Sequence, residues 1–137
     1  MRVLFDKVLF DLWTPPRLAA ALDRHLAASG GGAVHVGDLP GGPHAPDLAR
    51  VARAGGGLVV TGDVRLHGVP ALRLAYRQAG LRALALGSGF GALPVGRQAA
   101  LLVERWPEVE LVLGSSPAPF LFELPVGRSC ALRPLPP

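Results

Sequence analysis

Short apolar runs of strand length alternate with segments of helical spacing along this chain, and that alternation limits the folds it can adopt. The runs are 3–6 and 8–11, which repeat each other directly, then 33–36, 58–61, 81–86 and 120–124. The helical segments are 15–28, a short one opened by Asp47, then 70–79, and 95–105, which Trp106–Pro107 would end. Because parallel strands are joined through helices, the pattern predicts a layered α/β fold with a mostly parallel sheet.

The chain has 137 residues and no internal boundary, so we expect a single domain over 1–137. The run 120–124 is expected to form an edge strand of that domain. The proline-rich end from Pro134 is expected to be frayed.

Two aspartates stand where predicted strands end. The carboxyl ends of parallel strands share one edge of a sheet, so Asp63, just past the 58–61 strand, can neighbour the acid that ends the first strand. That acid is Asp6 or Asp11, depending on which copy of the repeat forms the strand. We favour Asp11, because only a short link separates it from the helix that Thr14 would cap.

Asp47 is a third candidate. It begins the helix that feeds the 58–61 strand, so it lies near the opposite end of that strand unless the loop before it folds back. If Asp11, Asp47 and Asp63 converge, their charges repel, and a bound cation normally stabilises such a cluster. Oxygen ligands without His or Cys select Mg²⁺ or Mn²⁺, which activate water for phosphodiester hydrolysis. On this hypothesis Asp63→Asn raises the melting temperature by relieving repulsion; the alternative is three unrelated capping or turn aspartates.

The basic residues are nearly all arginine, and the net charge of +4 is compatible with a phosphate-bearing partner. Between Asp63 and Glu104 the chain carries arginines and no acid. Arg65, Arg73 and Arg77 in this stretch are the candidate RNA contacts, and the last two are one helical turn apart. A solvated helix face is the alternative explanation for that pair.

The sequence also bears on disulfide, zinc and dinucleotide sites and on the location of the protein in the cell. Cys130 is the single cysteine, which excludes an internal disulfide and a cysteine-rich zinc site. No apolar run is long enough to span a membrane and no secretion signal is evident, so we expect a cytoplasmic protein. Gly87–Ala92 fits a dinucleotide-binding glycine pattern, but it follows the fourth strand instead of the first, and Pro94 interrupts its turn.

Several runs, in their order and spacing, resemble PIN-like domains, and most closely the VapC-type toxins of toxin–antitoxin pairs. They are Phe10–Leu18 (FDLWTPPRL), Asp47, Val59–Asp63 (VVTGD), Pro70–Arg73, Ala79–Arg82 and Pro117–Phe120. The resemblance covers nearly the whole chain. It implies a three-layer α/β/α fold and Mg²⁺- or Mn²⁺-dependent cleavage of RNA, with an antitoxin partner and often a homodimer.

The resemblance also implies roles for particular residues. By position, Asp11, Asp47 and Asp63 match the metal-binding acids of the family, and Thr61 matches the threonine of the last motif. Many relatives have a glutamate where this chain has Leu72. A missing fourth acid would weaken the nuclease.

This chain also has Leu12 and Trp13 where relatives usually carry small polar residues. Together with the absent fourth acid, this departure leaves an alternative function open. The chain would then be a PIN-like module that has kept the fold and binds RNA or a protein partner without cleavage.

Overall fold

The sheet has six strands among the residues that the structure describes. This computed structural model describes residues 7–38, 57–127 and 130–137. The strands are β1 (Lys7–Phe10), β2 (Gly32–His35), β3 (Leu58–Thr61), β4 (Arg82–Leu86), β5 (Phe120–Leu124) and β6 (Arg133–Pro134). They lie in the order β2-β1-β3-β4-β5-β6, and each neighbouring pair is parallel except β5 with β6. The prediction of an α/β fold with a mostly parallel sheet is therefore confirmed.

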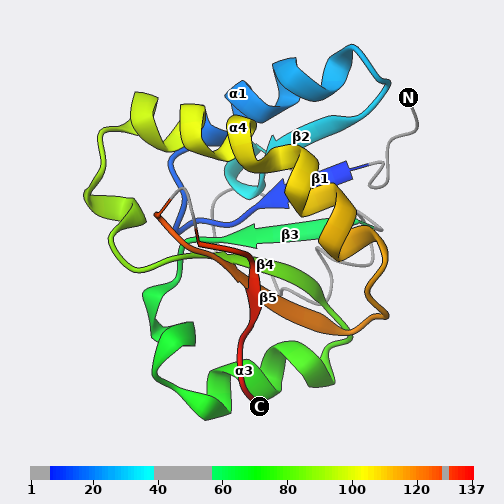
Figure 1. The fold of residues 1–137 in the computed structure, drawn as a ribbon, viewed down its shortest axis with the longest axis vertical. Helices are drawn as coiled ribbons and strands as arrows, with labels where there is room; N and C mark the ends of the chain where they lie inside the picture. Colours follow the sequence, from blue (N-terminus) through cyan, green and yellow to red (C-terminus); the bar gives the residue numbers. More distant parts are fainter. Residues whose placement is uncertain (1–6, 39–56, 128–129) are drawn as a thin grey trace.

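Helices cover both faces of the sheet (Figure 1). The helices α1 (Pro16–Ala27) and α4 (Val95–Gly114) pack against each other over one face, and α3 (Pro70–Gln78) lies on the other. Short 3₁₀ helices follow three strands: η1 (Val36–Asp38) after β2, η2 (Val64–His67) after β3 and η3 (Phe90–Ala92) after β4. These connections gather at the carboxyl edge of the parallel strands, where sheets of this kind bind their ligands.

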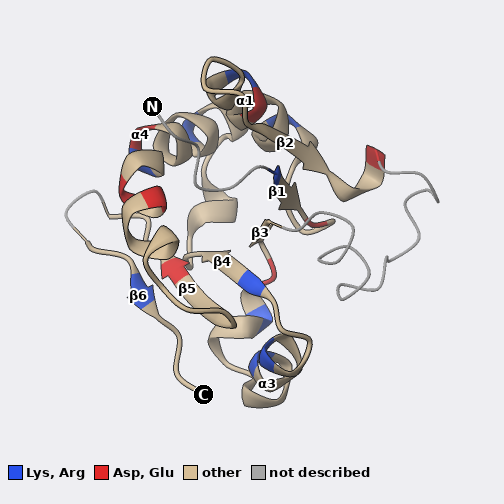
Figure 2. Ribbon diagram, turned by 90° about the vertical axis from the view of Figure 1, so that its right-hand side faces the viewer, with Lys and Arg blue, Asp and Glu red and all other residues tan. Residues whose placement is uncertain are grey.

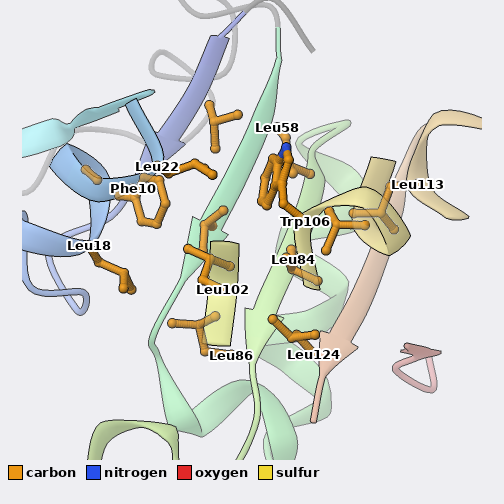
Figure 3. Close-up of a cluster of buried hydrophobic side chains, with 14 of the residues drawn as sticks. Phe10, Leu18, Leu22, Leu58, Leu84, Leu86, Leu102, Trp106, Leu113 and Leu124 are labelled. Atoms are coloured by element: carbon orange, nitrogen blue, oxygen red, sulfur yellow. The ribbon is translucent and has the colours of Figure 1, made fainter. Parts of the chain in front are cut away.

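Alternating residues of the central strands build two apolar cores, one on each face of the sheet. The larger core lies under α1 and α4 and contains Phe10, Leu84 and Trp106. Figure 3 shows Trp106 of α4 directed toward the strands near Leu84. The smaller core lies under α3 and contains Val59 and Ala83. Because successive residues face opposite cores, a shift of one residue would exchange the two sets, so this alternation fixes the strand register.

The last long helix continues past the proline that we expected to end it. Pro107 lies inside α4, which runs on to Gly114. A proline has no N–H to donate to the carbonyl four residues earlier, which normally weakens a helix. Trp106, Val109 and Leu113 are all buried in the larger core, so packing against the sheet stabilises the second half of α4.

The prediction that the last strand is an edge strand with a frayed end beyond it was wrong. The two residues of β6 pair with Phe122 and Glu123 of β5, so β5 has a neighbour on both sides. Leu135 is buried in the smaller core, and its N–H donates to the carbonyl of Leu121 at 2.9 Å. Apolar burial and this hydrogen bond hold the proline-rich segment on the domain.

The second copy of the direct repeat forms β1, so Asp11 is the acid that follows the first described strand. Asp6 and the helix expected to begin at Asp47 lie outside the described residues. Within the described ranges, no helix combines the length and the apolar character that crossing a membrane requires.

Candidate active site

Asp11 and Asp63 meet at the carboxyl edge of two adjacent strands. β1 and β3 are parallel neighbours, with Phe10 opposite Val60, and the N–H of Asp11 donates to the carbonyl of Val60 at 3.1 Å. The side chain of Asp11 then accepts from the N–H of Gly62 at 3.3 Å. The two strand ends thereby bring two carboxylates close together.

Asp11 is a buried carboxylate held by hydrogen bonds. Its Oδ1 accepts from the N–H of Trp13 at 3.0 Å as well as from Gly62, and its carboxylate also bonds the hydroxyl of Thr61. Burial, which disfavours the charged form, raises the pKa of Asp11 above its ordinary value. The hydrogen bonds offset part of this rise, and the negative charge of Asp63 adds to it. The charged form of Asp11 is therefore costly in the folded protein.

Asp63 is buried too, but it has a cationic partner. Both of its oxygens accept from the guanidinium of Arg65, with Nε at 2.9 Å from Oδ1 and Nη2 at 2.7 Å from Oδ2. The N–H of Arg65 also donates to Oδ1 at 3.1 Å, so Asp63 caps η2. These bonds from Arg65 lower the pKa of Asp63. The expectation that Asp63→Asn relieves repulsion is thereby corrected, because the substitution would break an ion pair.

Thr61 links the two acids to a buried tyrosine. Its hydroxyl oxygen accepts from the N–H of Asp63 at 3.1 Å, and the hydroxyl also bonds Asp11 and Tyr76 of α3. Burial raises the pKa of Tyr76 to about 12, and the hydrogen bond with Thr61 offsets part of this rise. Sequence analysis missed Tyr76, although a buried tyrosine hydroxyl normally needs a polar partner.

The three arginines predicted to contact RNA differ in their surroundings. Arg73 is buried, and its Nη1 donates to the carbonyl of Leu66 at 2.8 Å. Arg77 is half-buried, and its Nη2 donates to the carbonyl of Leu135 at 2.8 Å, so it holds the C-terminal segment. Both therefore make structural contacts within the domain, and their role in RNA binding stays a prediction. Figure 2 shows basic positions distributed over several helices and strands.

Arg65 alone of the three predicted RNA contacts has a largely exposed side chain, at 57%. Its guanidinium lies 5.0 Å from the ring centroid of Trp13, a cation–π contact. Arg65 thus connects Asp63 to the loop that follows β1.

A cleft of about 320 Å³ opens beside the acids, and we call it the edge cleft. It is bordered by the 12–15 loop, by Gly62 and Val64 after β3, by the turn after β4, and by Gln98 of α4. The glycine-rich segment 87–92 contributes Gly87 and Gly91 to this wall. This segment contains η3, and Leu93 and Pro94 separate it from α4, so the direct passage from the glycine turn into a long helix that a dinucleotide-binding fingerprint requires is not met.

The donor chemistry of the acid pair suits a hard divalent cation, but the described ligands are few. Two carboxylates and the Thr61 hydroxyl are oxygen donors of the kind that Mg²⁺ and Mn²⁺ prefer. Among the described residues no group of three or more His, Cys, Asp or Glu could hold a metal ion. Asp47 lies outside them, and Leu72 packs on the smaller core. A cation here would also compete with Arg65 for Asp63.

Comparison with known proteins adds one match. The profile of a family described as "PIN like domain" matches residues 6–88, a span that includes Asp11, Thr61 and Asp63. No curated protein and no solved structure matched the chain. PIN-like domains are generally nucleases, and PIN domains generally use divalent metal ions. Because the match covers more than half of the 137 residues and the α/β fold agrees with it, the chain belongs to the PIN-like domain family.

Proposed function

We propose that this domain is a ribonuclease that hydrolyses RNA phosphodiesters at Asp11 and Asp63 with the help of Mg²⁺ or Mn²⁺. The observation that carries the proposal is the pair of buried carboxylates on adjacent strand ends, next to a cleft. Burial of carboxylates opposes folding unless they are paired. A carboxylate with a raised pKa beside a cleft is therefore a candidate functional group.

Each residue of the site has a role in the proposed reaction. Asp11 and Asp63 would hold the cation, and Asp47 is the sequence candidate for a further ligand. The cation would supply an activated water and stabilise negative charge at phosphorus. Hydrogen bonds from Thr61 and Gly62 fix the direction of the Asp11 carboxylate. Arg65, released from Asp63, is placed to contact a phosphate of the substrate.

The direct test is cleavage of a pool of single-stranded and structured RNAs. We expect cleavage by the wild type with millimolar Mn²⁺ or Mg²⁺, and its loss when EDTA is added. The activity is expected to be slow, because Leu72 stands where many relatives have an acid and Arg65 occupies Asp63. Cleavage that persists in EDTA would contradict the metal dependence, and no cleavage with any RNA or metal would contradict the nuclease.

Competition between Arg65 and a cation gives a second test. Arg65→Gln is expected to increase the rise in melting temperature that millimolar Mn²⁺ causes, since the cation no longer displaces a guanidinium from Asp63. Differential scanning fluorimetry with and without Mn²⁺ measures this difference. Arg24→Gln, at an exposed position in the last turn of α1, is the matched control and should respond as the wild type does. An equal response in all three proteins would argue against cation binding at Asp63.

The same Arg65–Asp63 pair favours a second candidate function, an RNA-binding module without cleavage. Here Arg65 would permanently neutralise Asp63 in place of a metal. RNA binding that weakens with salt, together with no cleavage by the wild type or Arg65→Gln, would support this alternative.

We also propose, from the resemblance to VapC-type toxins, that the ribonuclease is the toxin of a toxin–antitoxin pair. Its partners would be an antitoxin protein and a second copy of this chain. Expression of the wild type should then arrest growth, and an unaffected growth rate at a verified expression level would contradict the toxin role.

A further inference from the structure

We propose that the edge cleft binds one unpaired nucleobase of an RNA strand, stacked on Trp13, next to the phosphate on which Asp11 and Asp63 act. The inference rests on the proposed function. Its starting point is position: Trp13 and Gly62 both border the cleft, and the N–H groups of both donate to Oδ1 of Asp11. A base in the cleft would therefore be directly beside the acid pair.

Exposed apolar side chains are concentrated around the edge cleft. Six large hydrophobic residues are exposed in the described part of the chain, and three of them border the cleft: Leu12 at 42%, Trp13 at 60% and Val64 at 64%. Apolar side chains that collect at one cavity mark a binding surface. The others are Val69 at the start of α3, Leu74 in α3 and Leu111 in α4.

The loop that carries Trp13 is fixed in this position. The hydroxyl and the N–H of Thr14 both donate to the carbonyl of Asp11, at 2.8 and 3.2 Å. The ring of His35 bonds the Thr14 carbonyl through Nε2 at 2.9 Å, which ties the loop to the end of β2. Thr14 was expected to cap α1 with its side chain, but Pro15 is the cap residue and the Thr14 hydroxyl holds this turn instead. The backbone that carries the exposed indole is thereby held beside the cleft.

The chemistry around Trp13 fits a nucleotide better than a purely apolar ligand. Arg65 supplies a positive charge at the ring for a phosphate and does not border the cleft, so it leaves the cleft itself open for a base. Aromatic side chains stack on any base, and single-stranded RNA exposes its bases for such contacts.

The polar wall and the size of the cleft agree with a base. Gln98 lies in the wall, and its Nε2 donates to the carbonyl of Leu93 at 2.9 Å, which fixes the orientation of an amide that can bond a base edge. The volume of about 320 Å³ is near the lower limit of ligand pockets, so it suits one base and not a paired duplex.

Binding of a fluorescein-labelled single-stranded RNA decamer tests this, with EDTA present to prevent cleavage. We expect Trp13→Ala to weaken binding by about 10-fold, Trp13→Phe to retain most of the affinity, and Leu111→Ala on α4 to bind as the wild type does. Gly91→Leu should also weaken binding, because a Cβ there would meet no atom within 4 Å and the added side chain can enter the cleft mouth without disturbing the fold. RNA should quench Trp13 fluorescence, with Trp106, which is buried, as the unquenched reference.

Several outcomes would overturn the inference. Equal affinity of wild type and Trp13→Ala would do so, as would equal affinity of the wild type for the decamer and for a matched strand without bases. If the wild type cleaves RNA while Trp13→Ala binds and cleaves equally well, the base site fails and the nuclease stands. If RNA quenches Trp13 and Trp13→Ala binds about 10-fold more weakly but nothing is cleaved, the nuclease fails and the base site stands.

Discussion

Asp11→Asn is expected to abolish RNA cleavage and, at the same time, to stabilise the fold. Loss of a direct ligand should lower the cleavage rate by more than about 100-fold, since even residues that only orient ligands cost roughly 10- to 100-fold. The amide keeps an oxygen for the N–H groups of Trp13 and Gly62, and its NH₂ can bond Thr61. It removes the buried charge, so the melting temperature at pH 7 should rise by a few degrees.

The stabilising effect of Asp11→Asn should depend on pH. Because the pKa of Asp11 is raised in the folded protein, the folded state binds the proton more tightly than the unfolded state. Its contribution to the free energy of unfolding therefore falls as the pH rises from the ordinary value of 3.8 through the raised pKa. The gain from Asp11→Asn should be largest above that pKa and should vanish below pH 3.8, which chemical denaturation over a pH series measures.

Asp63→Asn is the matched comparison, and it should act in the opposite direction. The pKa of Asp63 is lowered, so its contribution to stability is present above the ordinary value and is lost as the pH falls through the lowered pKa. The substitution should therefore destabilise the protein at pH 7, by less than about 1 kcal/mol because Arg65 is largely exposed. Stabilisation by Asp63→Asn, or destabilisation by Asp11→Asn, would contradict the electrostatic description of the two acids.

Gly62→Ala is expected to disrupt the acid pair through the backbone. A Cβ at Gly62 would lie 2.5 Å from the carbonyl oxygen of Trp13, so the 12–15 loop and the end of β3 must separate. Overpacking of this kind typically costs about 1–3 kcal/mol. The separation would break the hydrogen bond from Gly62 to Asp11, and misplacement of catalytic groups by about 1 Å can cost roughly 100-fold in rate.

Gly68→Ala is the control, because a Cβ there meets nothing within 4 Å and the residue has an ordinary φ of −127°. Melting temperatures and cleavage rates of the two variants should differ clearly, with Gly68→Ala close to the wild type. A Gly62→Ala protein with wild-type stability and activity would show that the loop and strand can separate without cost.

The sequence predicted where Asp11 and Asp63 lie better than it predicted the ion pair that Asp63 forms. Short apolar runs specify parallel strands, and strand ends at one edge bring Asp11 and Asp63 together. The pairing of Asp63 with Arg65 depends on the turn into η2, where Asp63 is the cap residue and its carboxylate accepts from both the N–H and the guanidinium of Arg65. Arg73 looked exposed from its residue type, but its place on the inner side of α3, with Tyr76, buries it. The role of Asp47 stays a prediction.

The two residues of β6 have a consequence for the behaviour of the whole sheet in solution. An open strand offers unpaired N–H and C=O groups on which other chains can add, which is a route to aggregation. β6 covers β5, and it does so with a charged residue, Arg133, and with Pro134, which has no N–H to offer a further strand. This short, proline-containing segment therefore stops the growth of the sheet on that side and protects the domain from edge-to-edge association.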